Sequence, residues 1–546
     1  MTESISELNG SGELSNYRDG GIASYDVVIV GAGIAGSVFA RELSGLGLRI
    51  LVLEKGAHYQ NHLKEFKENE LDMWNRVWPS RQYEVEGNAF TGAPNFGFGV
   101  GGGSLVWTNV CLRFHRHDFR MKSTYGMVHG AALEDWPFSY EDIETYYQNA
   151  EDQLGVAGAP SVWHDQRQQE FPFPPFDAYP SSAVLQEGMA KSGLRSGPGP
   201  VAVASLTRGQ RNTCLHCGFC RSSCRIDAKF QADSAVFKPL LQSRQVELVS
   251  QAEVIRLIQD RHHSLVNGLE YVDLKDGRRR KIRGRLFFVC NNPIETPRLF
   301  LNSASAFSPS GLGNRRNLVG RHLFGHIGTV GAGISDRCLN TSIGYNMGNV
   351  ISLDHVQSSG SDSHVGGFVL ESLQGSGAGV LAVDPYRDLW GAQLKDAMRK
   401  YNNGIYMVSF GETMPVYGNR VSLSKSLKDA HGMPQARIEY SWHENDLAVD
   451  RHARDVMTNV FRSAGISSVH FNPTPFEAHL QGTMRMGTDP GQSVTDPWGK
   501  VHGLDNVYVG GASLYVTGSS VNPTLTLYAL ALRTAAHVRN RFGLRR

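Results

Sequence analysis

A glycine-rich turn near the N-terminus constrains the fold more than any other feature of this chain. The apolar, β-branched run 26–30 is followed by Gly31, Gly33 and Gly36 at GxGxxG spacing. The run predicts a buried parallel strand, and the pattern SVFARELSGLGL after the glycines predicts a helix. The second predicted strand, RILVLEKG, ends near Glu54. This order of strand, glycines, helix, strand and acid predicts a Rossmann-like βαβ unit that binds a dinucleotide.

Each part of this unit has its own physical task. Gly31 permits the tight turn, Gly33 lets the backbone approach a pyrophosphate, and Gly36 lets the helix pack close to the sheet. The helix N-terminus offers free N–H groups and a positive dipole end to the phosphates. Glu54 is expected to accept hydrogen bonds from a ribose diol. The unit alone does not distinguish NAD from FAD, and an ordinary βαβ unit without a ligand is the alternative.

Size, charge and composition exclude several classes of protein. A chain of 546 residues fits about two to four domains. The net charge of +2 gives no reason to expect nucleic acid or a membrane surface as a partner. No run of about 18 apolar residues predicts a membrane span, and the polar start at 1–20 does not resemble a secretory signal. We therefore expect a cytoplasmic protein whose residues 1–20 form a disordered arm.

The C-terminal part of the chain holds the most specific motifs. HLQGTMRMG spans 479–487 and SVNPTLT spans 520–526. Four further motifs precede them in the chain: GGGSLVWT at 101–108, NPIETPRL at 292–299, VGRHLFGH at 319–326 and GNRVSL at 418–423. In this order they resemble the glucose–methanol–choline (GMC) flavoprotein oxidoreductases, most closely the pyranose oxidase branch. The resemblance covers residues 24–540 and implies FAD-dependent oxidation of an alcohol.

The resemblance also implies an α/β architecture with two domains. A discontinuous FAD-binding, Rossmann-like domain is expected from residues 21–160, 225–325 and 475–546. Residues 326–474 are expected to form a substrate-binding domain on an antiparallel sheet with helices, and 161–224 a connecting region with a cysteine-rich loop. The residues themselves agree, because 326–475 contains β-rich runs bounded by Gly, Asn and Asp and a helical pattern near 443–465.

In the family the reaction needs a base for the hydroxyl proton and an acceptor for the hydride, which is the flavin N5. The resemblance places His479 at the position of the base and Asn522 at the position of its partner. Histidine suits the task because its pKa lies near neutrality. The Asn522 amide can hold the substrate oxygen as charge develops there. A capping or core histidine and a turn asparagine are the alternatives.

The resemblance predicts which residues contact the FAD. They are Gly31, Gly33, Gly36, Glu54, Gly102, Ser104, Thr108, Val254, Gly511, Pro523 and Thr524. Two positions depart from common family patterns. Val106 stands where pyranose oxidases carry the histidine that bonds covalently to FAD, so noncovalent FAD is expected. Gly511 stands where many relatives have an acid. Thr108 is either a hydrogen-bond donor near flavin N5 or a simple strand residue.

Four of the seven cysteines are crowded into one short segment. Cys214, Cys217, Cys220 and Cys224 have the spacing C-x2-C-x2-C-x3-C, which is that of bacterial ferredoxins. An iron–sulfur cluster, a structural zinc and free cysteines are the three alternatives. The remaining cysteines are expected to be small buried apolar residues.

The substrate is the property that the sequence indicates least clearly. The resemblance favours a sugar, a glycoside or an aminoglycoside-type polyol. Asp384 or Glu371 can then pair with an ammonium group, although exposed loop acids are the alternative. Long-chain or sterol alcohols, a nicotinamide-linked dehydrogenase and a non-catalytic flavin or iron–sulfur electron-transfer protein are the competing hypotheses. The electron acceptor, whether oxygen, quinone or protein, stays open.

Overall fold

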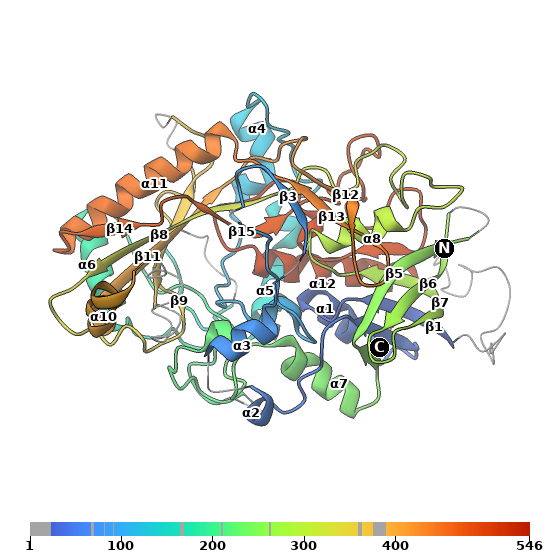
Figure 1. Cartoon of the computed structure of the whole chain (residues 1–546), viewed down its shortest axis with the longest axis horizontal. Helices are drawn as coiled ribbons and strands as arrows, with labels where there is room; N and C mark the ends of the chain where they lie inside the picture. The colour runs from blue at the N-terminus through green and yellow to red at the C-terminus, as the bar shows by residue number, and fades with distance from the viewer. Residues whose placement is uncertain are drawn as a thin grey trace.

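The computed structural model describes residues 23–66, 70–80, 82–90, 92–163, 169–208, 211–260, 264–358, 363–374 and 389–545. The arm predicted at 1–20 and Asp384 lie outside these residues. Two large sheets lie at opposite ends of the molecule, and helices cover both (Figure 1).

The first sheet has seven strands and carries the predicted βαβ unit. The strands are β1 (Ala23–Val30), β2 (Ile50–Glu54), β4 (Glu247–Ser250), β5 (Ala252–Gln259), β6 (Val266–Asp273), β7 (Arg278–Val289) and β16 (Val507–Val509). Their order is β4–β2–β1–β7–β6–β5, with β16 also beside β7. β1 is parallel to β2 and β7, and β6 is antiparallel to β5 and β7. Strands from three distant chain segments therefore join one sheet.

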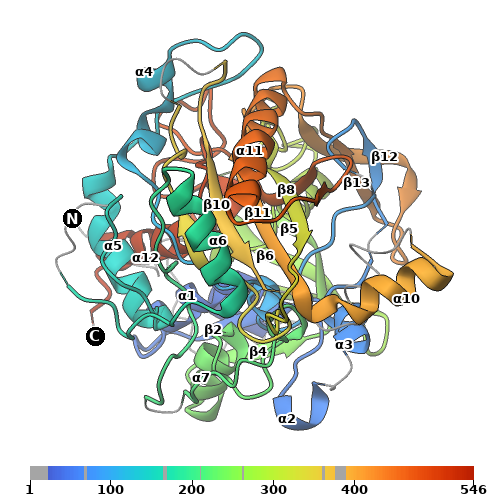
Figure 2. The same ribbon diagram turned by 90° about the vertical axis from the view of Figure 1, so that its left-hand side faces the viewer.

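The second sheet has six antiparallel strands. They are β8 (Phe324–Ile334), β9 (Met347–Ser352), β10 (Phe368–Leu373), β11 (Gly404–Glu412), β14 (Val469–Phe471) and β15 (Phe476–Gln481), in the order β14–β8–β11–β10–β9 with β15 also beside β8. Helices α6 (Pro180–Lys191) and α11 (Glu444–Ser463) cover one face (Figure 2). The helix predicted near 443–465 is thereby confirmed. The opposite face, with Val369, Val408 and Phe410, belongs to the core shared with the first sheet.

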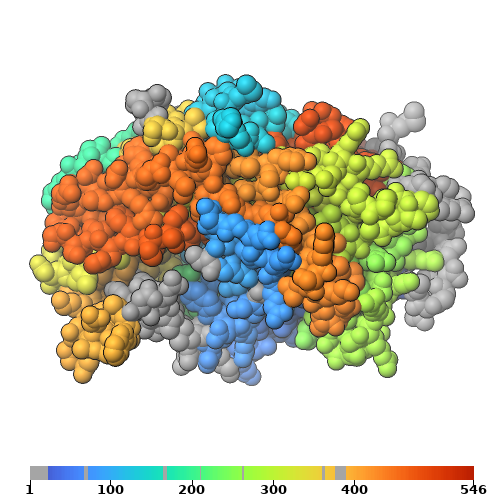
Figure 3. Space-filling model, turned by 45° about the horizontal axis from the view of Figure 1, so that its top comes forward, coloured from blue at the N-terminus to red at the C-terminus, as the bar shows by residue number. Residues whose placement is uncertain are grey.

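A small third sheet joins segments that are far apart in the sequence. It consists of β12 (Arg420–Lys428), β13 (Pro434–Glu439) and β3 (Glu84–Glu86). β3 pairs in parallel with β13, and the blue N-terminal segment accordingly lies against orange C-terminal segments in Figure 3. The boundary predicted at residue 475 differs from the observed pairing, because β15 extends the second sheet by pairing with β8. β15 pairs along an edge of β8, and the composition of the chain does not reveal this long-range pairing.

Three helices form the core against the first sheet. α1 (Ile34–Leu43) packs against α12 (Thr524–Arg541), and α12 packs against α5 (Tyr140–Leu154). The other α-helices of the described residues are α2 (His62–Glu65), α3 (Glu70–Val77), α4 (Met121–Tyr125), α7 (Lys238–Gln242), α8 (Glu295–Asn302) and α10 (Gly391–Arg399). Among the described residues, no helix combines the length and the apolar character that crossing a bilayer requires.

Candidate active site

The predicted glycine turn joins β1 to α1 with the expected geometry. Gly31 has φ +100°, a left-handed conformation that favours glycine. A Cβ on Gly36 would lie 2.0 Å from the Gly31 carbonyl oxygen, so only glycine allows this close packing. Gly33 precedes α1 without a side-chain cap, and a Cβ there would meet nothing within 4 Å. The first turn of α1 therefore offers uncapped N–H groups beside open space, which is what a pyrophosphate requires.

A second glycine segment lies against the start of α1. The 3₁₀ turn Gly102–Leu105 approaches so closely that a Cβ on Gly102 would lie 2.9 Å from the Gly33 Cα. Ser104 fixes this turn, because its hydroxyl donates to the Gly101 carbonyl at 2.7 Å and accepts from the Ala232 N–H at 2.9 Å. The turn is thus held at the predicted phosphate end of the site.

Glu54 ends β2 beside the glycine turn. Its carboxylate accepts from the Ala32 N–H at 2.9 Å and from the Gly56 N–H at 2.7 Å. These two bonds hold the carboxylate and leave lone pairs for further donors, because a carboxylate has about four acceptor positions. The position is compatible with the predicted ribose contact.

Three other predicted contacts have different surroundings. Thr108 is half-buried in a segment without strand structure, so the alternative of a simple strand residue is wrong. Val254 is half-buried in β5 opposite Tyr271. Gly511 has φ +96° just before the 3₁₀ turn at 512–514, a backbone conformation that an acid side chain would strain.

His479 lies in an irregularity of the second sheet. The pairing of β15 with β8 shifts register between Ala478 and Gln481, and His479 stands inside this shift with φ +55°. Bulges of this kind re-aim a side chain, and left-handed non-glycine residues gather at functional sites. His479 keeps partial exposure, and its ring lies 4.9 Å from that of Phe410. Burial, and next the neighbouring His326, lowers the pKa of His479 well below its ordinary value, so the ring is neutral near pH 7.

His326 on β8 connects His479 to the segment that precedes Asn522. Its Nδ1 lies 3.0 Å from Nδ1 of His479, and its Nε2 donates to the Ser519 carbonyl at 2.6 Å. His326 is fully buried, and burial lowers its pKa to about 4. The structure thus brings His479 and the turn 519–522 to opposite sides of one imidazole.

Asn522 precedes the N-terminus of α12. Pro523 is the N-cap residue and Thr524 is the first helical residue, with no side-chain cap. The Tyr515 hydroxyl donates to the Pro523 carbonyl at 2.7 Å and fixes the turn. Asn522 is 3 % exposed, and its Oδ1 is buried without a hydrogen-bond partner among the described residues. A buried amide of this kind, at the positive end of a helix, is suited to a polar ligand.

Comparison with known proteins identifies the family. Two family models described as GMC oxidoreductase match residues 25–328 and 415–531. The chain belongs to the GMC oxidoreductase family. It is 30% identical to 6'''-hydroxyparomomycin C oxidase of Streptomyces lividus, over 95% of this chain and 93% of that protein. It is 29% identical to paromamine 6'-oxidase of Streptomyces fradiae, over 94% and 91%.

Solved structures confirm the predicted fold class. A crystal structure of formate oxidase superposes with a TM-score of 0.69 at 14% identity, covering 95% of this chain and 98% of that one. The family and fold predictions are therefore confirmed, and the protein is an oxidoreductase that acts on alcohol groups.

The residues of this oxidoreductase fit FAD. Open space in front of Gly33 and Gly103, the uncapped start of α1 and the unpartnered Asn522 Oδ1 are the observations that support the fit. Val106 is 7% exposed and packs in an apolar cluster with Tyr59 and Phe66. A valine has no nucleophilic atom, so residue 106 cannot bond covalently to a flavin.

The cysteine run does not form a metal site in this structure. Within the part of the chain that is described, no group of three or more His, Cys, Asp or Glu side chains lies close enough to hold a metal ion. Cys217 is exposed whereas Cys220 is buried. Burial raises the pKa of Cys220 to about 12 and that of Cys214 to about 11. The arrangement supports neither an iron–sulfur cluster nor a zinc ion. Cys338, which was expected to be buried, is exposed.

The structure adds His326 to the candidate site and gives Glu371 a different place from the one expected. His326 is the last residue of the VGRHLFGH motif and lies on β8. The register between β8 and β11 places it opposite Glu412 of β11. Glu371, expected as a loop acid or an ammonium partner, lies instead on β10 with no exposure. Its carboxyl oxygens are buried without a hydrogen-bond partner of good geometry among the described residues. Burial raises the pKa of Glu371 to about 8, opposed by the nearby Asn522 amide.

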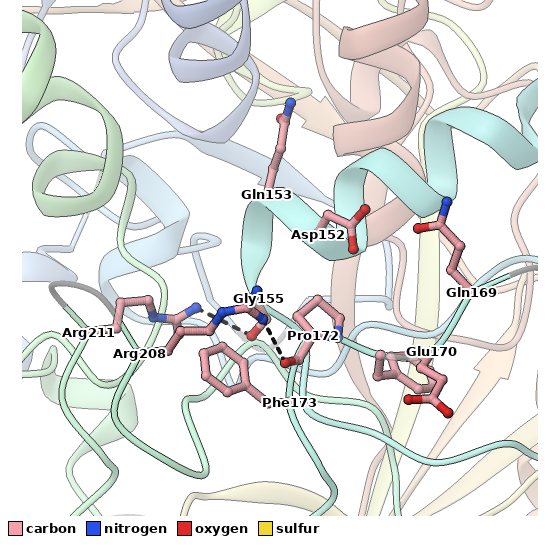
Figure 4. Close-up of a pocket in the computed structure, with 10 residues that line it drawn as sticks. Asp152, Gln153, Gly155, Gln169, Glu170, Pro172, Phe173, Arg208 and Arg211 are labelled. Carbon is pink, nitrogen blue, oxygen red and sulfur yellow. Dashed lines mark hydrogen bonds between the residues drawn. The ribbon is translucent and has the colours of Figure 1, made fainter.

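Two cavities of the structure, of about 700 Å³ and about 920 Å³, are lined by neither His479 nor Asn522. A groove of about 700 Å³ lies at the end of α5, where Arg208 and Arg211 face Phe173 (Figure 4). Arg211 donates to the carbonyls of Leu154 and Ala202, so it ties chain segments together. These contacts indicate a structural role for the groove.

Proposed function

We propose that this oxidoreductase oxidises a CH–OH group of a sugar-like polyol, with amino sugars as the first substrates to test. The observation that carries the proposal is the neutral, partly exposed His479, joined through His326 to the turn that holds Asn522. The names of two relatives, oxidases of 6'''-hydroxyparomomycin C and of paromamine, support this substrate class.

The proposed chemistry divides between a base and an amide. The neutral imidazole of His479 takes the hydroxyl proton, a contribution typically of about 10²–10⁴ in rate. The Asn522 amide donates to the substrate oxygen while negative charge develops there. Noncovalently bound FAD supplies the hydride acceptor. Gly33, Gly36, Glu54 and the turn around Gly102 hold the cofactor in this proposal.

The test is anaerobic titration of the purified holoprotein, followed by flavin absorbance. Paromamine, glucose, a long-chain primary alcohol and a sterol are added separately. Loss of the oxidised flavin bands with an amino sugar or sugar supports the proposal. Reduction by the long-chain alcohol or sterol alone favours the second substrate class, and a flavin that none of these reduces contradicts the proposal.

His479→Ala provides the matched control. The variant should bind FAD and be reduced by dithionite, yet its reduction by substrate should fall at least about 10²-fold.

Comparing oxygen uptake with dye reduction then assigns the electron acceptor among oxygen, a quinone and a protein.

A further inference from the structure

We propose that His326 is a positioning residue that makes Nε2 of His479 the basic nitrogen of the active site. A neutral imidazole carries one proton and can act as a base only through its bare nitrogen. Which nitrogen is bare depends on the hydrogen bond that the other nitrogen makes. The inference rests on the proposed role of His479 as the base and adds the device that prepares it.

The first step concerns the Ser519 carbonyl. A carbonyl oxygen can only accept, so its 2.6 Å contact with Nε2 of His326 requires a proton on that nitrogen. His326 has no exposure, and its burial disfavours the doubly protonated ring. His326 is therefore the Nε2–H tautomer, and its Nδ1 presents a lone pair.

The second step carries this constraint to His479. Nδ1 of His326 faces Nδ1 of His479 at 3.0 Å. Two lone pairs at this distance would repel, so the His479 nitrogen must carry the proton and donate. Because His479 is also neutral, its Nε2 is left bare on the ring that keeps partial exposure. The backbone carbonyl thus sets the tautomers of both rings in sequence.

The surroundings hold both rings in place. Phe410 lies 5.8 Å from the ring of His326 and 4.9 Å from that of His479. The two imidazoles are inclined by 86° and meet through their Nδ1 atoms, which lie 3.0 Å apart. Val521 N–H donates to the Ser519 hydroxyl at 3.3 Å and stabilises the turn that carries the accepting carbonyl. The tautomer is therefore fixed by backbone and packing before any substrate arrives.

The direct test is ¹⁵N NMR of histidine-labelled holoprotein, which separates protonated from bare ring nitrogens without turnover. The His479 signals are assigned by their loss in His479→Ala. We expect a proton on Nδ1 and none on Nε2 of His479, with the reverse pattern for His326. A proton on Nε2 of His479, or a doubly protonated His326 at neutral pH, would overturn the proposal.

Two substitutions of His326 separate tautomer control from simple packing. In His326→Gln the amide N–H₂ can donate to Ser519 and the amide oxygen can accept from His479, so both bonds can be rebuilt. His326→Phe keeps a ring and removes both bonds. We expect His326→Gln to keep kcat within about tenfold. His326→Phe should lower it by about 10²–10⁴-fold with less change in KM, as expected for a base histidine held in the wrong tautomer.

A second histidine pair supplies the matched control. Nε2 of His364 lies 2.9 Å from Nδ1 of His452, a residue of α11. His452→Phe keeps a ring, removes this hydrogen bond and should leave kcat unchanged. Equal losses in His326→Gln and His326→Phe, or full activity of His326→Phe, would contradict the proposal. Failure of the proposed function has a different signature, namely a flavin that no alcohol reduces although His479 shows the expected tautomer.

Discussion

Gly33 and Gly36 belong to one turn, yet the structure gives them different constraints. A Cβ on Gly36 would collide with the Gly31 carbonyl, whereas a Cβ on Gly33 would enter open space. Gly36→Ala should therefore destabilise the protein by about 1–3 kcal/mol even without cofactor. Gly33→Ala should keep the stability of the cofactor-free protein and weaken FAD binding. Thermal unfolding with and without FAD checks both, and equal behaviour of the two variants would refute the assignment.

Single residues were predictable where a motif records their task. The glycines could be named because their spacing is constrained by backbone geometry, whereas His479 and Asn522 could be named because the family resemblance implies their roles. His326 could not be given a role, because its contact with His479 depends on the β15 irregularity and on a carbonyl 193 residues away. Glu371 was misjudged as a loop acid, since one acid in a β-rich run does not reveal which face it occupies.

At the scale of elements, local periodicity predicted α1, α11 and the strands flanking the glycine turn. The sequence did not predict which distant segments pair as strands. β15 joins the second sheet by occupying the edge of β8, and β3 joins β13 across more than 300 residues. These choices depend on which edges remain free after the sheets assemble, and no local pattern records that.

The cysteine run, for which the sequence left three alternatives open, has a structural contact with the glycine turn. Its segment is tied to the glycine turn by Lys229, whose buried ammonium donates to the Cys220 carbonyl at 2.6 Å and to the Leu105 carbonyl at 2.9 Å. Lys229→Met should orphan the Cys220 carbonyl and leave the Leu105 carbonyl with the Ser223 hydroxyl as donor. It should lower stability by about 1–3 kcal/mol and loosen bound FAD. Chemical denaturation and flavin release measure the two effects. The exposed Lys238→Met should change stability by less than about 0.5 kcal/mol, and equal stability of both variants would contradict the tie.

At the scale of the whole molecule, buried titratable groups set the pH dependence of stability. Burial raises the pKa of Glu371 to about 8, so the native state keeps a proton that the unfolded state loses above its ordinary value of 4.5. Burial opposes the charge on His62, but its bonds to Asp227 and Asp233 raise its pKa to about 10. Its stabilisation is complete below about pH 6.5 and is lost as the pH rises through 10. Raising the pH therefore lowers the free energy of unfolding through both groups.

We accordingly expect Tm of the holoprotein to fall as the pH is raised from about 6.5 to about 10. Each unit of pKa difference corresponds to about 1.4 kcal/mol. Glu371→Gln carries no ionisable proton, so its decline between pH 6.5 and 8 should be shallower than that of the wild type. Glu444→Gln, at an exposed glutamate, should keep the wild-type decline. Differential scanning calorimetry at fixed ionic strength measures these slopes. A flat or rising Tm over this range, or an unchanged slope in Glu371→Gln, would show that the Glu371 carboxyl is already ionised in the native protein.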